Sequence, residues 1–456
     1  MKHTKSILAA LVAALSVGAA SATTTKTNGV YGDQIFIAGS TAMASKSMPA
    51  IDAYLTNVAQ GYSKIAADNA SASSAKIALY TKVVTTTNGS TVTITTNGVS
   101  IHFIGSEGGT LVTASKTTQP FLPISFTGSV TKDATVGGFV VPSAQCTYNT
   151  FATITFSDVN QAVGRFAAGS KTSPVKTVAL QEVGSGINAV NFAFVAPTNF
   201  PGSNITDQVA RELLSVGYAP LSHITGNASD SNSTVYITGR DIDSGTRSLT
   251  FIETGFGLLS SASQYMYDNT TGSFFKTVGG TNFFNGQSFT AGNGGYFSGG
   301  DLCTYVGNSA TNVGVISIAT ANGTNNTVTP FSTNTGGKNY LIGYAGTADI
   351  IGKTNTIALS YNGVAPYSGT NSYAGFQTTN NGIANGSYSL WSIEHLYYNL
   401  ANAPKGTLTN DIVNLANGVY STLTNTPTVT LGYGYTALTD MKVKRSAYEG
   451  STIISK

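Results

Sequence analysis

Charged residues are scarce in this chain of 456 residues, since Asp, Glu, Lys and Arg make up only 9% of it. In typical soluble domains they make up about 25%. The formal net charge is only +3. A nucleic-acid partner requires a basic face that neutralises phosphate groups, and this composition argues against one. Hydrophobic residues still reach 41%, which permits a full core and excludes an intrinsically disordered chain.

Cysteine and histidine are also rare. The cysteines, Cys146 and Cys303, could pair in an oxidising compartment, and they are equally compatible with two buried thiols. None of the histidines after the first residues stands at metal-ligand spacing from another ligand; they are His102, His223 and His395. The sequence therefore predicts no metal site, and no motif in it indicates a cofactor.

A long hydrophobic run occurs only near the N-terminus. Lys2 and Lys5 precede an apolar run over residues 7–17, and the small residues of 20–22 follow it. This order is typical of a secretory signal, and the run is shorter than the roughly 20 residues of a membrane-spanning helix. We expect residues 1–22 to be cleaved, which lowers the net charge by two, to +1. The mature chain is then expected without a membrane span, in the periplasm or at the cell surface.

Small polar residues follow four of the strands that the sequence predicts. The four clusters are Gly39-Ser40-Thr41, Gly105-Ser106, Ser157-Asp158 and Ser244-Gly245-Thr246. In open α/β sheets, ligands bind outside the carboxyl ends of strands, where helix N-termini present unpaired N–H groups. Hydroxyl groups add donors without charge, and glycine lets the backbone come close to a ligand. The recurrence of such clusters at four strand ends favours an anion site.

The stretch GRDIDSGTRS, residues 239–248, combines such a turn with unusual charge for this chain. A guanidinium fork matches the geometry of an oxyanion, so Arg240 is the candidate for the charged group of the site. Each part also has a structural interpretation. A serine or threonine at a helix start is often a plain N-cap, Arg240 could pair with Asp241 or Asp243 at the surface, and Asp158 could cap its own turn.

The motifs resemble those of the periplasmic phosphate-binding proteins of ABC uptake systems, which are two-lobed class II solute-binding proteins. IAGSTA (37–42) is similar to their first-strand turn, and the resemblance places Ser40 and Thr41 at the anion. GSEGG (105–109) resembles their second glycine-rich turn, with Ser106 as a ligand. FSDVN (156–160) is similar to the turn whose carboxylate accepts the phosphate proton, which implies that role for Asp158.

The second lobe of that family is represented by GRDIDSGT, residues 239–246. The resemblance implies that this motif contributes four residues to the site, namely Arg240, Ser244, Gly245 and Thr246. GVISIA (314–319) is similar to the strand that returns to the first lobe.

Three residues depart from the family pattern. Ala42 stands where an aromatic residue is common, and Ile242 stands where an aspartate often orients the arginine. Asp241 or Asp243 would have to take over that role. Glu107 puts a carboxylate beside an anion turn, where it would repel phosphate unless it points away.

The resemblance implies an α/β, two-lobed periplasmic-binding-protein-like fold with β-rich, loop-rich insertions. The first lobe is expected over residues 23–190, with an insertion at about 110–150, and the second over 191–319. Residues 320–456 are expected to return to the first lobe. Helices are predicted over 389–401 and 410–423, and hairpin turns at Asn88-Gly89 and Asn97-Gly98.

The resemblance implies a function without enzyme activity, which is capture of phosphate or a similar oxyanion in a cleft between the lobes. The partner would be an ABC permease. The low charge and the many Thr, Ser, Asn and Gly residues leave an alternative open. In it, the protein is a structural or adhesive cell-surface protein built on the same scaffold, with its insertions as the contact face.

Overall fold

The computed structural model describes most of the chain after the predicted signal peptide, which itself lies outside the described residues. The described ranges are 24–26, 34–57, 59–88, 91–136, 139–165, 180–268, 273–277, 280–281, 288–289, 295–309, 318–319, 327–328, 337–351, 353–367, 382–403, 409–426 and 434–456. Within these ranges, no helix has both the length and the apolar character needed to cross a membrane.

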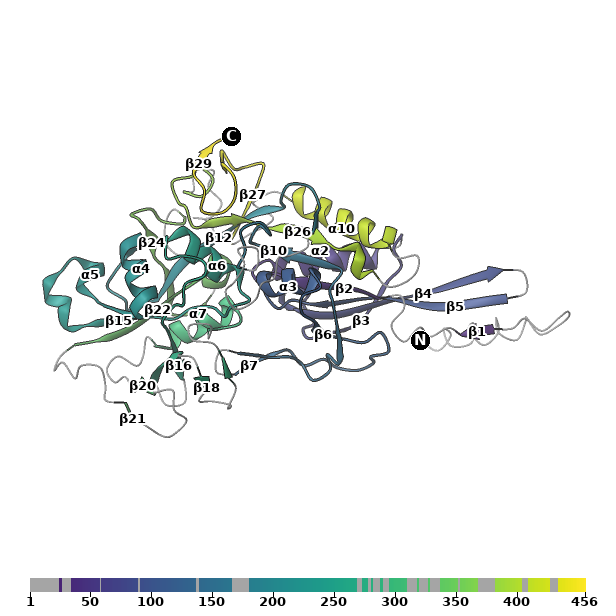
Figure 1. Cartoon of the computed structure of the whole chain (residues 1–456), viewed down its shortest axis with the longest axis horizontal. Coiled ribbons are helices and arrows are strands. Elements are labelled where there is room, and N and C mark those ends of the chain that lie inside the picture. Colours follow the sequence, from purple (N-terminus) through teal and green to yellow (C-terminus); the bar gives the residue numbers. More distant parts are fainter. Residues whose placement is uncertain are drawn as a thin grey trace, which may run out of the picture.

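The fold is α/β and consists of two lobes, each built on its own mixed sheet (Figure 1). We call lobe I the part around the sheet with strand order β11-β26-β10-β2-β5-β4-β3, on which β1 adds to β5. Its strands are β1 (Thr24–Lys26), β2 (Gln34–Gly39), β3 (Ser63–Ala67), β4 (Ile77–Asn88), β5 (Thr91–His102), β10 (Ile154–Ser157), β11 (Gln181–Glu182) and β26 (His395–Tyr398). Its helices are α2 (Ala44–Thr56), α3 (Ser106–Thr113) and α10 (Thr409–Thr424).

Lobe II surrounds the sheet with order β14-β15-β22-β12-β23, and β25 and β27 also pair with β12. Its strands are β12 (Asn188–Pro197), β14 (Tyr218–Pro220), β15 (Thr234–Ile237), β22 (Asn339–Gly346), β23 (Thr356–Ala358), β25 (Trp391–Ile393) and β27 (Tyr435–Ala437). Its helices are α4 (Asp207–Val216), α5 (Ser222–Thr225), α6 (Gly245–Glu253), α7 (Gly299–Asn308) and α8 (Thr347–Ile350).

Short two-stranded sheets complete the fold. They pair β6 (Gln119–Phe121) with β9 (Tyr148–Thr150), β7 (Ala134–Val136) with β8 (Phe139–Val141), β13 (Asn204–Ile205) with β24 (Ser360–Tyr361), β16 (Gln264–Asp268) with β17 (Ser273–Thr277), β18 (Gly280–Thr281) with β19 (Ser288–Phe289), β20 (Ile318–Ala319) with β21 (Thr327–Val328), and β28 (Val443–Arg445) with β29 (Ile453–Ser455). Several of these short strands lie in the predicted insertion of about 110–150, which is β-rich as expected.

The strand ends of lobe I meet because β10, β2 and β5 are adjacent and parallel. Their carboxyl ends therefore lie at one edge of the sheet. β2 is buried along its whole length and leads through Ser40 and Thr41 to α2. β5 leads to α3 and β10 leads to Asp158. The predicted strand-to-turn order is confirmed at all three strands.

The helix predicted over 410–423 is confirmed as α10, two other local predictions are wrong, and Gly89 of the turn predicted at Asn88-Gly89 lies outside the described residues. The helix predicted over 389–401 is instead the strands β25 and β26, because Trp, Ile and Tyr pack well on both faces of a sheet. Asn97-Gly98 is not a turn but lies within β5, which pairs with β4 along twelve residues of each strand.

The division of residues 320–456 between the lobes differs from the prediction. β22 and β23 fall in this range but belong to the sheet of lobe II, where β22 pairs with β12 and with β15. Of the expected return strand, 314–317 lie outside the described residues, and β20 pairs with β21. The chain instead re-enters lobe I at Glu394, the single residue between β25 on β12 and β26 on β10.

Cys146 and Cys303 are both buried and do not form a disulfide. Cys146 packs in a cluster of lobe I with Leu79 and Leu122, and Cys303 lies on α7 in a cluster of lobe II. The interpretation as two buried thiols is therefore correct, since each thiol serves as a small apolar core residue.

Candidate functional site

The site lies where the strand ends of lobe I face the N-terminus of α6 in lobe II. Both lobes are in direct contact here. The backbone amide of Glu107, in the first turn of α3, donates to the carbonyl oxygen of Asp243 at 3.0 Å. Gly105 has a φ of +115°, and a Cβ on it would lie 2.4 Å from the same carbonyl oxygen. Only glycine allows this approach of the two backbones.

Arg240 is the central cation of the site and is only 1% exposed. Its Nε and Nη2 donate to the carbonyl oxygens of Tyr296 (3.0 Å) and Phe297 (2.6 Å). Nη2 also donates to the Thr41 hydroxyl of lobe I at 3.2 Å, and Nη1 to the Thr246 hydroxyl at 3.4 Å. Two carbonyls thus orient the fork, while two hydroxyls from different lobes flank it.

No carboxylate among the described residues forms an ion pair with Arg240. The surface pairing considered for Arg240 with Asp241 or Asp243 is therefore wrong, and neither replaces the missing orienting aspartate. A buried charge is normally paired, because removal from water is costly. Arg240 is thus a buried cation that can accept a further anion.

Asp158 is the buried acid of the site, and it is bound by Ser106 of lobe I and lies against Gly245 of lobe II. The Ser106 hydroxyl donates to Asp158 Oδ1, and a Cβ on Gly245 would lie 1.6 Å from the same oxygen. Asp158 Oδ2 is buried and has no hydrogen-bond partner among the described residues. The site therefore contains an open acceptor next to the N-terminus of α6.

Burial raises the pKa of Asp158 to about 6, while the hydrogen bond from Ser106 and the charge of Arg240 both act to lower it. The role considered as an alternative for Asp158, a cap of its own turn, belongs to Ser157 instead. The Ser157 hydroxyl accepts from the Val159 amide at 3.2 Å and donates to the Val159 carbonyl at 2.7 Å.

Two predicted site residues use their hydroxyls within their own turns. Ser40 accepts a hydrogen bond from the Met43 amide at 3.2 Å in the turn before α2, and Ser244 caps α6 by accepting one from the Arg247 amide at 3.4 Å. Both residues are buried. Among the eight predicted residues, direct contacts between the lobes join Thr41 to Arg240 and Asp158 to Gly245.

The Glu107 carboxylate, which was expected to repel phosphate unless it points away, is buried and hydrogen-bonded. Its Oε1 accepts from the Ser248 hydroxyl at 2.6 Å and from the Arg165 amide at 2.9 Å. Burial raises the pKa of Glu107 to about 7, against the lowering effect of these two bonds. Glu107 therefore links α3 to α6 and loses most of its negative charge below neutral pH.

Two residues of the site region were missed by the sequence analysis. Glu394, at the crossing between β25 and β26, is fully buried. Burial and the charge of Asp158 raise its pKa well above the ordinary range, and the Ser40 hydroxyl opposes this. Tyr435 donates its hydroxyl hydrogen to the Ala42 carbonyl. Its aromatic ring therefore lies beside the position at which Ala42 replaces the common aromatic residue. The only local signal for Glu394 is a lone acid within an apolar run.

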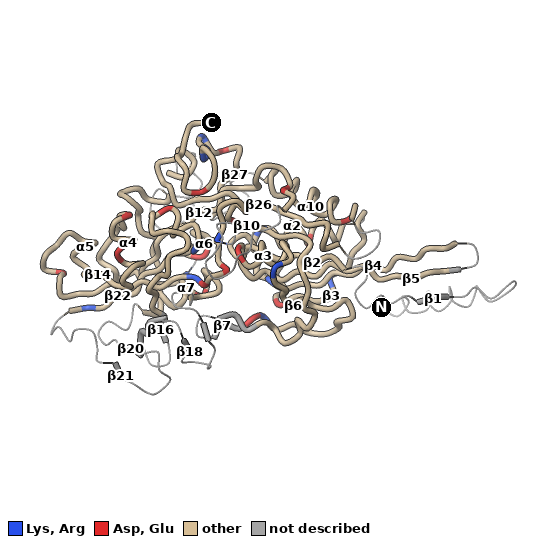
Figure 2. Tube along the Cα trace, viewed as in Figure 1, with Lys and Arg blue, Asp and Glu red and all other residues tan. Residues whose placement is uncertain are grey.

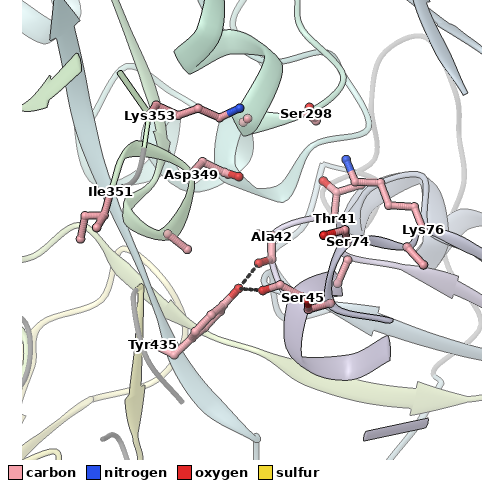
Figure 3. A pocket seen from close by; sticks show the side chains of 16 residues that line it. Thr41, Ala42, Ser45, Ser74, Lys76, Ser298, Asp349, Ile351, Lys353 and Tyr435 are labelled. Atoms are coloured by element: carbon pink, nitrogen blue, oxygen red, sulfur yellow. Dashed lines mark hydrogen bonds between the residues drawn. The ribbon is translucent and has the colours of Figure 1, made fainter. Parts of the chain in front are cut away.

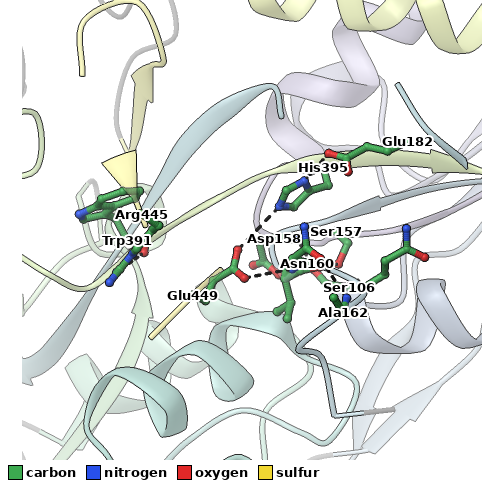
Figure 4. A network of polar contacts seen from close by, with 12 residues as sticks. Ser106, Ser157, Asp158, Asn160, Ala162, Glu182, Trp391, His395, Arg445 and Glu449 are labelled. Atoms are coloured by element: carbon green, nitrogen blue, oxygen red, sulfur yellow. Dashed lines mark hydrogen bonds and ion pairs between the residues drawn. The ribbon is translucent and has the colours of Figure 1, made fainter. Parts of the chain in front are cut away.

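A polar network extends from Asp158 towards the C-terminus (Figure 4). His395 contacts Glu182 at 2.6 Å and Glu449 at 3.7 Å, and Glu449 accepts from the Asn160 amide at 3.4 Å. The carboxylates of Glu182 and Glu449 raise the pKa of His395 to about 9, against the effect of burial. His395 is therefore a cation at neutral pH.

The few charges of the chain are distributed sparsely, and several lie between α3 and α6 (Figure 2). Among the described residues, no group of three or more His, Cys, Asp or Glu side chains is arranged to hold a metal ion. The arrangement offers hydroxyls, a guanidinium fork and an unpartnered buried acceptor, which together suit a partly protonated oxyanion.

Comparison with known proteins finds no matching family model and no matching curated protein. Solved structures do match. A protein of Clostridium perfringens, described as a phosphate ABC transporter substrate-binding protein with bound phosphate, has a TM-score of 0.40 and 13% identity, over 85% of this chain and 93% of its own. An ABC-type phosphate transport receptor of Vibrio cholerae has a TM-score of 0.38 and 11% identity, over 84% and 93%. PstS of Borrelia burgdorferi has a TM-score of 0.33 and 11% identity, over 89% and 98%.

Proposed function

We propose that this chain is an exported solute-binding protein that captures phosphate, or a similar oxyanion, between its two lobes and delivers it to an ABC permease. The observation that carries the proposal is the buried Arg240. Its guanidinium lies between hydroxyls of both lobes and makes no ion pair among the described residues. A bound oxyanion would supply the negative charge that such a buried cation requires.

The unpartnered oxygen of Asp158 favours phosphate over other oxyanions as the ligand. Hydrogen phosphate carries a proton that can be donated to the unpartnered Asp158 Oδ2. Sulfate has no proton at neutral pH, so it would leave this buried acceptor unsatisfied and would be repelled by its charge. A phosphate group that carries a proton is therefore preferred over sulfate in this proposal, and no chemical conversion of it is involved.

Capture would require the lobes to separate and close again. In the structure, Arg240 of lobe II donates to the Thr41 hydroxyl of lobe I, so a donor of the site is used in a bond across the junction. An entering anion would replace this contact and draw both lobes onto itself, as in other hinge-closing proteins. The binding free energy would thus be shared between the two sheets.

The test is calorimetry of the purified mature chain with inorganic phosphate, with sulfate as the comparison. Thermal melting should also shift upwards, because a ligand at about 100 times its Kd stabilises the folded state by about 2.7 kcal/mol. A measurable heat with phosphate and a much weaker one with sulfate would support the proposal. No heat and an unmoved melting curve at millimolar phosphate would refute it.

A second candidate function is a structural or adhesive role at the cell surface. The β4–β5 ribbon favours it, because this threonine-rich hairpin projects beyond the rest of lobe I (Figure 1) and exposes Val83 by 65%. Failure of phosphate binding, together with self-association that is lost when 83–96 are replaced by a short turn, would favour this role instead.

A further inference from the structure

A pocket of about 360 Å³ lies between the lobes, beside the predicted site (Figure 3). Thr41 and Ser45 line it from lobe I, and Ser298 and Asp349 line it from lobe II. Thr41 is half-buried, whereas the neighbouring site residues Ser40 and Arg240 are fully buried. The pocket is thus an open space next to a closed cluster.

Arg240 connects this pocket to the predicted oxyanion site. The same Nη2 atom donates to the Thr41 hydroxyl and to the carbonyl oxygen of Phe297, which directly precedes Ser298. The guanidinium therefore contacts Thr41, which lines the pocket from lobe I, and the residue next to Ser298, which lines it from lobe II. A group covalently attached to an oxyanion on Arg240 could therefore extend into this pocket.

The pocket carries an excess of positive charge. Lys76 and Lys353 line it together with one acidic residue, Asp349. Figure 3 shows both ammonium groups on the side of the pocket where Ser298 lies. Lys76 packs with its Nζ 5.4 Å from the centre of the Phe297 ring, and Lys353 donates to the Thr304 hydroxyl at 3.1 Å. Lys76 is thus held by a contact between the lobes, and Lys353 by one within lobe II.

The size of the pocket exceeds what a bare oxyanion needs. A tetrahedral oxyanion has four oxygens, each about the size of a water molecule with its share of about 30 Å³, so it would fill less than half of the space. Small-molecule pockets have volumes from about 300 Å³ upwards. The space beside Arg240 therefore has room for a substituent larger than an oxyanion itself.

We propose that this pocket is a second subsite, which takes an anionic group linked to the captured oxyanion, so that the preferred ligand is a phosphate compound with a second negatively charged group. Lys76 and Lys353 would contact that second group, while Arg240 holds the first. The proposal rests on the oxyanion function and makes its substrate class more specific. The linked group can be organic, as in a phosphorylated carboxylic acid, or a second phosphate.

The test compares the Kd values of four probes by calorimetry: inorganic phosphate, glycerol 3-phosphate, 3-phosphoglycerate and pyrophosphate. The two probes with a second anionic group should bind about fivefold or more tightly than inorganic phosphate, because they add an ion pair with a lysine. Comparison of 3-phosphoglycerate with pyrophosphate distinguishes an organic from an inorganic source. Glycerol 3-phosphate separates the effect of charge from that of size.

Lys353→Gln is the decisive variant, since Lys353 is exposed and its loss should not prevent folding. It should lower the ratio of 3-phosphoglycerate or pyrophosphate affinity to inorganic phosphate affinity by about threefold or more. Lys76→Gln should do the same. Lys82→Gln is the matched control, because Lys82 also packs on a ring, that of Tyr62 at 5.8 Å, but on another part of lobe I.

Equal or weaker binding of both doubly anionic probes, with a ratio unchanged by Lys353→Gln, would overturn the second subsite and leave phosphate capture standing. Absence of binding by all four probes would overturn the oxyanion function, and the second subsite with it.

Discussion

Gly245→Ala provides a direct test of the contact between the lobes. The new Cβ would lie 1.6 Å from Asp158 Oδ1 and 2.9 Å from Ser106 Cβ. Non-bonded atoms need about 3.5 Å, so one side must move by about 2 Å. Asp158 cannot simply rotate away, because it is buried and held by the Ser106 hydroxyl. Overpacking of this kind costs about 1–3 kcal/mol.

The lobes can avoid this cost by opening, because Gly245 and Asp158 belong to different lobes. The variant should therefore keep a melting temperature close to that of the wild type but show a larger radius of gyration in solution scattering. Phosphate affinity should fall by about 5- to 150-fold, which is the equivalent of that free energy. Calorimetry and scattering on the same preparations measure both quantities.

Gly300→Ala is the matched control for Gly245→Ala. Gly300 also lies in the first turn of a helix, and a Cβ there would meet its nearest atom, Asp349 Oδ1, at 3.6 Å, an ordinary contact. This variant should keep the scattering profile of the wild type and gain up to about 1 kcal/mol of stability. If Gly245→Ala retained both wild-type scattering and wild-type phosphate affinity, the inferred contact between the lobes would be refuted.

Three further outcomes are expected. Arg240→Lys should lose the guanidinium fork and weaken phosphate binding by about tenfold or more, whereas Arg211→Lys, at an exposed pair with Asp207, should not change it; equal affinities would remove Arg240 from the site. Asp158→Asn should narrow the preference for phosphate over sulfate in competition binding, and an unchanged ratio would mean that the carboxylate does not contact the anion. Thermal stability should fall as the pH rises from about 4 to 7. In the folded chain the pKa values of Glu107 and Asp158 are raised to about 7 and 6, so these groups keep their protons over a pH range in which the unfolded chain has already lost them. Each unit of pKa shift corresponds to about 1.4 kcal/mol of unfolding free energy. Glu107→Gln should therefore weaken the dependence of the melting temperature on pH. A melting temperature that rises over this pH range would contradict the raised pKa values.

The sequence could predict the strand ends of the site because each is a local pattern. An apolar run followed by glycine and hydroxyl residues defines the turn at Ser40 or Ser106 without knowledge of distant contacts. The parallel order of β10, β2 and β5 then brings these turns to one edge.

The parts that could not be predicted depend on contacts far apart in the chain. The apolar run around Trp391 fits a helix or two strands equally well, and only its pairing with β12 and β10 decides between them. Tyr435 reaches Ala42 across almost 400 residues of sequence, and no local pattern indicates this contact. The burial of Arg240 could not be predicted either, because its carbonyl partners at Tyr296 and Phe297 are more than 50 residues away in the sequence.

The crossing at Glu394 has a mechanical consequence. The Glu394 amide donates to the Asn188 carbonyl at 2.9 Å, and the Ile187 amide donates to the Glu394 carbonyl at 2.7 Å. At this crossing the two segments thus form a hydrogen-bonded antiparallel ribbon rather than two independent linkers, and the chain crosses between the lobes once more, from α10 to β27. Ribbons of two strands twist more than wide sheets do, but stretching one would break its ladder. Relative motion of the lobes should therefore be mainly torsion about this ribbon, and the amides of Ile187 and Glu394 should stay protected from hydrogen exchange while the amide of Glu107, which bridges the lobes, becomes exposed.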